Sequence, residues 1–171
     1  MTTAYFNCII VSNGSQLRSH AVLVKGDSIL DVLPEAEIPS DAHRIDLQGA
    51  YLAPGLIDIQ IYGSGGRLFG GIPTAEALQQ MEEDLLKQGT TGFFATVATN
   101  SNAVVAQAID AALAFRPRSG GVFQGLHLEG PYLNPLRKGA HPQEYIKKAT
   151  REEVRSWVER AAGELRIMTI A

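Results

Sequence analysis

The sequence contains little cysteine, no excess of basic charge and no long apolar run. Its single cysteine, Cys8, excludes an intramolecular disulfide framework and a cysteine-rich zinc site, and it favours a reducing compartment. Lysine and arginine number 15 against 18 aspartate and glutamate residues, so nucleic acid is not an expected partner. No apolar stretch reaches the roughly 18 residues of a membrane-spanning helix, and no basic segment precedes the first apolar run. We therefore expect a cytoplasmic protein with no export signal and no membrane contact.

The remaining composition is that of an ordinary globular protein, with 45% apolar and 19% charged residues in 171 positions. Residues 1–50 contain short β-rich pieces that are separated by turn residues such as Asn-Gly and Lys-Gly-Asp. The predicted strands are Tyr5–Val11, His20–Val24 and Ser28–Leu33. We expect this segment to form the N-terminal part of a small β-sheet domain, a β-sandwich.

From residue 51 onward, apolar runs alternate with helical patterns, as in a parallel α/β sheet. Thr74 is expected to cap a first helix that stops at Gly89, and Ser101 or Asn102 to open a second that ends before Pro117. The pattern Thr-Arg-Glu-Glu at 150–153 predicts a capping box for a third. The predicted strands are Leu52–Ile61, Gly92–Ala98, Val122–Leu128 and Leu165–Ala171.

This order predicts an α/β fold in which residues 51–171 are either the first half of a (β/α)8 barrel or an open sheet. A closed barrel typically takes about 250 residues, so only half of one fits here. The last apolar run would leave a hydrophobic edge that a complete protein normally covers. We therefore expect a fragment of a longer protein, with a short open sheet as the alternative.

Reactive groups in parallel α/β folds gather where the strands end. After the first strand, Asp58, Gln60 and Tyr62 share one face by alternation, and the glycine-rich stretch 63–66 is interpreted as a plain turn because it lacks phosphate-loop spacing. After the second strand, Thr96, Thr99 and Asn100 are interpreted as strand and cap residues, not as catalysts. They offer neither a base nor a strong metal ligand.

The third strand is followed by the most informative group, which comprises His127, Glu129 and His141. Carboxylate oxygen and imidazole nitrogen suit zinc and its first-row neighbours, so these residues are a plausible partial metal set. The alternative is that Glu129 binds its own turn, His127 is a satisfied core histidine and His141 lies on the surface. Spacing alone leaves both interpretations open.

Four motifs resemble one known family. They are Ala-Pro-Gly-Leu-Ile-Asp-Ile-Gln at 53–60, Gly-Thr-Thr-Gly-Phe-Phe-Ala-Thr at 89–96, Gly-Leu-His-Leu-Glu-Gly-Pro-Tyr-Leu-Asn at 125–134 and Lys-Gly-Ala-His at 138–141. In this order and at these separations, the chain resembles the first half of the N-acetylglucosamine-6-phosphate deacetylases, of the amidohydrolase superfamily. The resemblance implies a metal-dependent (β/α)8 hydrolase that is preceded by a small β domain and is usually a homodimer. Its substrate is a small sugar phosphate.

The resemblance also implies roles for particular residues. Glu129 matches the metal-binding glutamate, and Ala140 and His141 match positions that contact the sugar. Superfamily members with two metals have His-x-His after the first strand, whereas this chain has Gln60 and Tyr62, so one divalent metal, zinc, is expected. The remaining histidine ligands and the catalytic aspartate are expected beyond residue 171.

A lone carboxylate holds zinc poorly, so the 171-residue chain by itself is expected to be inactive. Two other functions stay open. The first is the deacetylation of another N-acetylated sugar phosphate, such as N-acetylgalactosamine 6-phosphate. The second is a non-catalytic half-barrel module.

Overall fold

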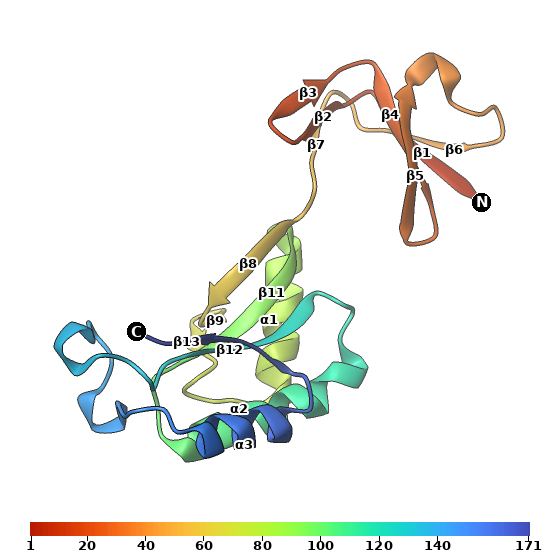
Figure 1. Ribbon diagram of the computed structural model, residues 1–171. Helices are drawn as coiled ribbons and strands as arrows, with labels where there is room; N and C mark the ends of the chain where they lie inside the picture. The colour runs from red at the N-terminus through yellow and green to blue at the C-terminus, as the bar shows by residue number, and fades with distance from the viewer. The chain divides into compact units, whose positions relative to one another are not determined.

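A computed structural model describes all 171 residues, and the chain divides into two compact units, Met1–Pro54 and Gly55–Ala171 (Figure 1). None of the helices combines the length and the apolarity needed to cross a bilayer.

The first unit consists of two small sheets. One has the strand order β5-β4-β1-β6 and the other β3-β2-β7. Small clusters of buried side chains, such as Ala4 with Leu23 and Cys8 with Ile10, hold these sheets together. The strands are β1 (Thr2–Phe6), β2 (Ile9–Ser12), β3 (Ser15–Leu17), β4 (His20–Lys25), β5 (Ser28–Pro34), β6 (His43–Asp46) and β7 (Tyr51–Leu52).

The predicted single strand Tyr5–Val11 is wrong, because the chain leaves one sheet at Phe6 and joins the other at Ile9. Asn7 adopts a φ of 52°, which a strand does not tolerate, and its side chain donates to Asp46 at 2.7 Å. Sequence alternation alone does not reveal this break, since the apolar run continues through it.

The second unit is a parallel sheet of order β13-β12-β11-β8, with a helix between successive strands from β8 onward. The predicted alternation of strands and helices is therefore confirmed. The elements are β8 (Leu56–Ile61), β9 (Gly63–Ser64), β10 (Arg67–Leu68), α1 (Ala75–Lys87), β11 (Thr90–Ala98), α2 (Asn102–Phe115), β12 (Phe123–Glu129), α3 (Arg151–Ala161) and β13 (Leu165–Thr169).

The predicted strand Leu52–Ile61 is also wrong as a single element. Residues 51–52 form β7 and pair with β2 in the first unit, whereas β8 begins at Leu56 and pairs with β11 in the second. Pro54 lies between them, and its missing N–H and fixed φ interrupt a strand ladder. This one apolar run thus contributes a strand to each of two different sheets.

The helix starts follow the predicted caps. The hydroxyls of Thr74, Ser101 and Thr150 accept hydrogen bonds from the backbone three residues on, at 3.1, 3.4 and 3.2 Å. The capping box at Thr150 is only half formed, because the Glu153 carboxylate is bound by Lys147 and does not return to the Thr150 backbone. The segment between β12 and α3, residues 130–150, is called the insertion below. It contains Lys147, whose contact with Glu153 replaces the second half of the capping box.

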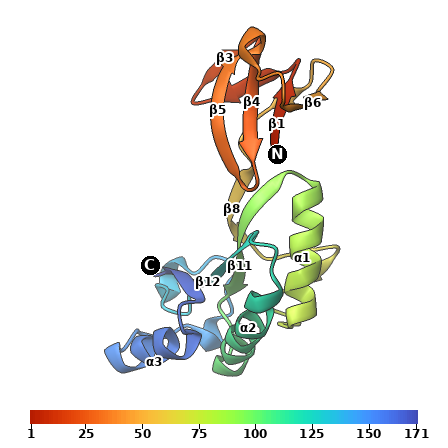
Figure 2. The same cartoon turned by 90° about the vertical axis from the view of Figure 1, so that its right-hand side faces the viewer.

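All three helices pack on the same face of the sheet and form one buried cluster with it (Figure 2). Its centre is the Phe123 ring, whose centroid lies 5.6 Å from that of Phe93 and 5.7 Å from that of Phe115. Along β12, Leu126 and Leu128 point into this cluster. Strand alternation therefore directs Glu129 to the opposite face.

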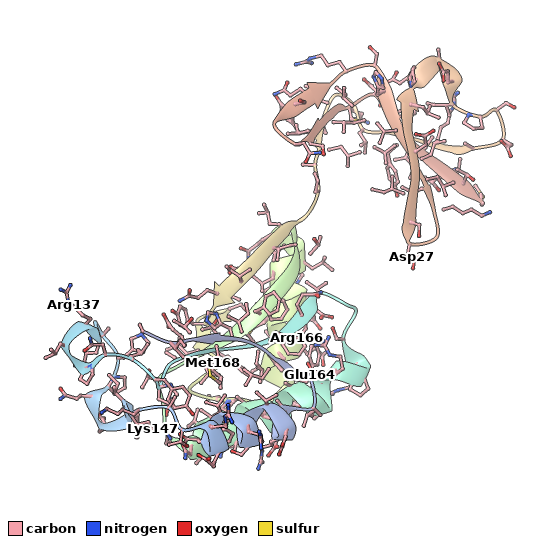
Figure 3. All side chains as sticks on the ribbon, in the orientation of Figure 1. Asp27, Arg137, Lys147, Glu164, Arg166 and Met168 are labelled. Atoms are coloured by element: carbon pink, nitrogen blue, oxygen red, sulfur yellow. The ribbon has the colours of Figure 1, made fainter.

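An ion pair fastens the end of α2 to the start of β13. The Arg116 guanidinium donates to both oxygens of the buried Glu164 carboxylate, at 2.8 and 2.6 Å, and to the Phe123 carbonyl at 2.6 Å. The hydrogen bond to Glu164 raises the pKa of Arg116 despite the opposing effect of burial. Glu164 and its neighbour Arg166 lie near the start of β13 (Figure 3).

Glu164→Gln is expected to lower the free energy of unfolding by about 2 kcal/mol, since it leaves the guanidinium without its charged acceptor. Asp110→Asn is the control, because Asp110 forms an exposed ion pair with Arg160. That change should cost no more than about 0.5 kcal/mol. The urea midpoints of the two variants and of the unsubstituted chain, at an unchanged m-value, measure these free-energy differences. Equal destabilisation by the two substitutions would contradict the prediction.

Candidate functional site

The candidate site lies where β8, β11 and β12 end at their carboxyl side. Glu129 is the last residue of β12, Thr99 follows β11, and Gln60 and Tyr62 stand at the end of β8. His141 reaches the same place from the insertion that follows β12. Parallel strands place their carboxyl ends at one edge, so residues far apart in the sequence meet here.

Both oxygens of the Glu129 carboxylate are held by side chains from β8 and its exit. The Gln60 amide donates to Oε1 at 2.9 Å, and the Tyr62 hydroxyl donates to Oε2 at 2.6 Å. The Gln60 amide nitrogen also lies 2.6 Å from the Tyr62 hydroxyl. Hydrogen bonds to a charged acceptor are the strong ones, so these two side chains fix the orientation of the carboxylate.

The Tyr62 hydroxyl keeps its proton at neutral pH. Burial raises the pKa of Tyr62, and the hydrogen bond to Glu129 raises it further against the weaker opposing effect of Gln60. Tyr62 therefore acts as a donor, which is the role that an ionised carboxylate requires of its neighbours. The third residue of the predicted face, Asp58, instead accepts from the Gln60 backbone at 3.0 Å.

His141 approaches the same carboxylate from the insertion. Its Nε2 lies 3.7 Å from Glu129 Oε2, and its Nδ1 lies 2.9 Å from Thr99 Oγ1. Lys138 donates to the His141 carbonyl at 3.0 Å, which holds the backbone at this point. Ala140, the other residue expected to contact the sugar, is exposed beside His141.

His127 is a core histidine, as the second interpretation predicted. It is 3% exposed, and its Nδ1 and Nε2 lie 2.9 Å from the Ile59 carbonyl and 2.8 Å from Thr169 Oγ1. Because a carbonyl only accepts, Nδ1 carries the proton and Nε2 accepts from the threonine hydroxyl. Neither nitrogen remains free to bind a metal.

The glycine-rich stretch after β8 is a turn, as predicted. Strands β9 and β10 pair antiparallel, and Gly65 and Gly66 between them have φ values of +57° and +76°. Two consecutive positive φ values are the geometry of a tight hairpin, which favours glycine.

The interpretation of Thr99 as a strand or cap residue is wrong. Its hydroxyl is 3.2 Å from the Glu129 carbonyl, in addition to its contact with His141, and the residue is 3% exposed. Ser101, not Thr99, caps α2. Thr96 is a strand residue, as predicted, and its hydroxyl bonds the Phe94 carbonyl. Asn100 lies between β11 and the cap Ser101 and accepts from the Ser101 backbone N–H, so it is neither a strand residue nor the cap. The only sequence signal for Thr99 was its place at a strand exit.

The insertion is attached to the helices through Lys147. Its ammonium binds the Glu153 carboxylate and the Asn102 side chain, and its backbone N–H donates to the Pro131 carbonyl. Burial is the largest single influence on the pKa of Glu153 and raises it, but the hydrogen bond and the charge of Lys147, together with the nearby Tyr132 and Asn102 side chains, outweigh burial and lower that pKa. Lys147 thus links the insertion to α2 and α3 and, through its backbone, to the start of the insertion at Pro131.

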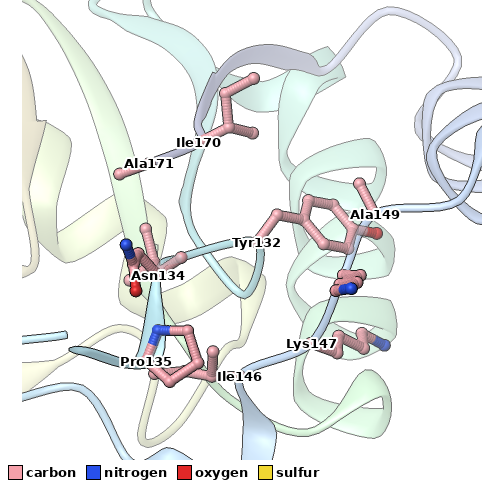
Figure 4. A pocket seen from close by; sticks show the side chains of 10 residues that line it. Tyr132, Asn134, Pro135, Ile146, Lys147, Ala149, Ile170 and Ala171 are labelled. Carbon is pink, nitrogen blue, oxygen red and sulfur yellow. The ribbon is translucent and has the colours of Figure 1, made fainter. Parts of the chain in front are cut away.

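A hollow of about 730 Å³ lies between the insertion and the end of β13. Figure 4 shows its mainly apolar lining, which includes Tyr132, Pro135, Ile146 and Ile170. Glu129 and His141 do not line it. The hollow is therefore separate from the polar group at the strand ends.

The Tyr132 hydroxyl is buried without a hydrogen-bond partner. Burial raises the pKa of Tyr132 to about 12, and the nearby Glu153 carboxylate adds to the shift. The folded chain therefore keeps this proton at pH values where the unfolded chain has lost it. Stability should accordingly fall as the pH rises from about 10 to about 12.

Tyr132→Phe is expected to remove up to about 2 kcal/mol of the stability that the chain loses between pH 10 and pH 12. At pH 7 it should change the free energy of unfolding by less than about 1 kcal/mol, since no hydrogen bond is removed. Denaturant titrations of both proteins across this pH range measure the effect. Tyr145→Phe, at a more exposed tyrosine, is the control, and an identical alkaline slope for Tyr132→Phe and the unsubstituted chain would refute the assignment.

The polar group supplies part of a metal-binding set. Glu129 offers a carboxylate and His141 an imidazole, but residues 1–171 contain no group of three His, Cys, Asp or Glu side chains that can hold a metal ion. Catalytic zinc usually has three protein ligands and an open position. The donor chemistry fits a divalent metal, and the number of donors in this chain does not complete its site.

Comparison with known proteins identifies close relatives. Residues 4–52 match the family model described as the NagA composite domain. The N-acetylglucosamine-6-phosphate deacetylase of Haemophilus influenzae is 38% identical over 152 residues, which is 89% of this chain and 40% of that protein. An N-acetylgalactosamine-6-phosphate deacetylase from a Shewanella species is 32% identical, over 91% of this chain and 40% of that protein.

Solved structures give the same result. The crystal structure of N-acetylglucosamine-6-phosphate deacetylase from Pasteurella multocida aligns with a TM-score of 0.90 and 32% identity, over 99% of this chain and 45% of that one. A mutant of the Mycobacterium smegmatis deacetylase, in complex with N-acetyl-D-glucosamine 6-phosphate, aligns with a TM-score of 0.83 and 25% identity over 99% of this chain and 43% of that one. This chain spans about two fifths of the length of the curated relatives it matches. Over that span, the resemblance to the N-acetylglucosamine-6-phosphate deacetylases that its motifs predict is confirmed.

Proposed function

We propose that this chain supplies part of an enzyme that hydrolyses the N-acetyl group of N-acetylglucosamine 6-phosphate, which gives glucosamine 6-phosphate and acetate. The observation that carries the proposal is the Glu129 carboxylate at a strand exit, oriented by Gln60 and Tyr62, with His141 Nε2 3.7 Å away. The relatives with this activity in their names match the chain over nearly its whole length. The proposed setting is cytoplasmic, with a small sugar phosphate as substrate and a homodimer as the complete enzyme.

The second unit is proposed to be the first half of a (β/α)8 barrel. Two observations support this. Its strands follow one another in space in the order of the sequence, and α1, α2 and α3 all cover one face. A doubly wound open sheet has helices on both faces, whereas a barrel has them only outside. In a barrel, the uncovered face with Glu129 would be the interior.

One divalent metal, with zinc as the expected ion, is proposed to bind at Glu129. When bound, such an ion polarises the amide carbonyl and makes its water more acidic. Gln60 and Tyr62 hold the carboxylate in one orientation, as partners of a metal ligand do. They also occupy the positions where two-metal relatives have histidines, so a single metal is proposed.

His141 and Ala140 are proposed to contact the sugar. His141 projects its ring toward Glu129 from a backbone fixed by Lys138, so it can orient a substrate relative to the carboxylate. The further histidine ligands and the aspartate that moves protons are proposed to come from the part of the relatives that this chain does not cover.

The 171-residue chain by itself is expected to bind zinc weakly and to release no acetate, because it provides an incomplete ligand set. Isothermal titration of zinc and an acetate assay measure these two properties. A tight site with one zinc per chain, unaffected by Glu129→Gln, would contradict the proposed ligand.

A chimaera tests the function directly. In it, this chain replaces the matching 152-residue stretch of the Haemophilus influenzae deacetylase. The chimaera should deacetylate N-acetylglucosamine 6-phosphate, and Glu129→Gln in it should lower kcat/KM by about 100-fold or more through weaker metal binding. Glu144→Gln, an exposed change in the same insertion, is the control and should leave kcat/KM unchanged. Wild-type activity of the Glu129→Gln chimaera would refute the proposal.

N-acetylgalactosamine 6-phosphate is the second candidate substrate, favoured by the 32% identity to the Shewanella deacetylase. The two sugars differ in one hydroxyl configuration, so the same hydrolytic group serves both. Side-by-side kcat/KM values of the chimaera distinguish them. No turnover of either sugar by a folded chimaera would favour the non-catalytic module.

A further inference from the structure

Strand β8 is irregular just before it reaches the candidate site. In its pairing with β11, β8 has two residues between Asp58 and Ile61, whereas β11 has only one residue between the partners of these two. The two residues of β8 are Ile59 and Gln60. Two residues opposite one form a β-bulge, which disrupts the ladder of backbone hydrogen bonds and is often found next to active sites. Regular pairing with β11 therefore does not hold the backbone around Gln60.

Side chains hold the peptide group at this bulge. His127 Nδ1 lies 2.9 Å from the Ile59 carbonyl oxygen, and because a carbonyl only accepts, Nδ1 is the donor. The N–H of the same peptide group belongs to Gln60, and it donates to Asp58 Oδ1 at 3.0 Å. Both polar groups of the peptide that joins Ile59 to Gln60 thus have a side-chain partner.

His127 also reaches the other edge of the sheet. The strand order β13-β12-β11-β8 places β8 and β13 at the two edges, and His127 belongs to β12. Its Nε2 lies 2.8 Å from Thr169 Oγ1 on β13, and the residue is 3% exposed. One buried imidazole therefore links both edge strands to β12, and its loss would leave the Ile59 carbonyl without this partner.

The His127 contact spans the same two strands as the hydrogen bond from Gln60 to Glu129. Glu129 follows His127 by two residues on β12, so alternation places both side chains on the face opposite the helices. Gln60 follows Ile59 directly, and its amide donates to Glu129 Oε1 at 2.9 Å. The ring of His127 therefore fixes the place of Gln60 relative to the carboxylate that Gln60 binds.

We propose that His127 and Asp58 are positioning residues that hold the bulged peptide of β8, so that the Gln60 amide meets the Glu129 carboxylate. Neither side chain is proposed to touch the substrate, and both act through Gln60. The inference rests on the proposed function, since it names what orients the carboxylate at the strand exit. A histidine that only fills the core would affect stability without affecting Gln60 in particular.

The Gln60 amide reports this arrangement directly. In the ¹⁵N-labelled 171-residue chain, NMR measures the exchange of its side-chain N–H groups with water, and Gln60→Ala assigns the signals by their loss. We expect the Gln60 proton that is bound to Glu129 to exchange at least about tenfold more slowly than the side-chain protons of the exposed Gln143. The indole signal of Trp157, in the core on the helix side, shows whether a variant has folded.

His127→Leu removes the donor to Ile59 and should bring the Gln60 exchange rate to within about twofold of that of Gln143. His127→Asn places an amide N–H near the position of Nδ1 and should restore most of the protection. Thr169→Val is the matched control, because it removes the contact with Nε2 of the same ring but leaves the contact with Ile59. It should leave the Gln60 exchange rate unchanged.

Asp58 tests the same peptide group from its other side. Asp58→Ala should speed the exchange of the Gln60 side chain about fivefold or more, since the Gln60 backbone loses its acceptor. Asp58→Asn keeps an acceptor oxygen at this position and should retain the slow exchange.

Exchange at Gln60 as fast as that at Gln143 in the unsubstituted chain would overturn the proposal, and so would an unchanged rate in folded His127→Leu or Asp58→Ala. If His127→Leu does not fold, Asp58→Ala decides the question. Equal acceleration by Thr169→Val and His127→Leu would indicate a general loosening of the sheet and would also overturn the proposal. The assay needs neither metal nor turnover, so an inactive chimaera and an unprotected Gln60 are separate failures.

Discussion

The candidate site depends on how one carboxylate is held at the edge of a parallel sheet. Glu129 ends β12 on the face opposite the helices, and Gln60 and Tyr62 bind one oxygen each. A carboxylate that is removed from bulk water is tolerated only with such donors. Its orientation is therefore determined by the pairing of β8 and β12 with β11 between them.

This arrangement explains why Gln60 and Tyr62 matter although neither is a good metal ligand. Strand alternation brings them to the face of Glu129. In this chain the same positions provide hydrogen-bond donors to the carboxylate. Gln60 and Tyr62 thus orient the carboxylate that is proposed to bind the metal.

The scaffold and the site are stabilised at opposite ends of the strands. Near the strand starts, Arg116 and Glu164 join α2 to β13 beneath the Phe123 ring. At the strand exits, Lys147 ties the insertion that carries His141 to α2 and α3. The contacts that stabilise the sheet and helices are therefore distinct from those that hold the candidate site. This is typical of folds that place functional residues on loops above a rigid scaffold.

The sequence by itself determined the alternation of the main strands and helices in the second unit, the three caps and the family resemblance, since these depend on local periodicity and motif spacing. It also singled out Glu129 and His141. Only the tertiary structure decided that one apolar run serves two sheets, that His127 is fully bonded in the core and that Thr99 contacts His141. These facts depend on which strands become neighbours and which donor meets which acceptor, and no spacing along the chain encodes that for residues 40 or more positions apart.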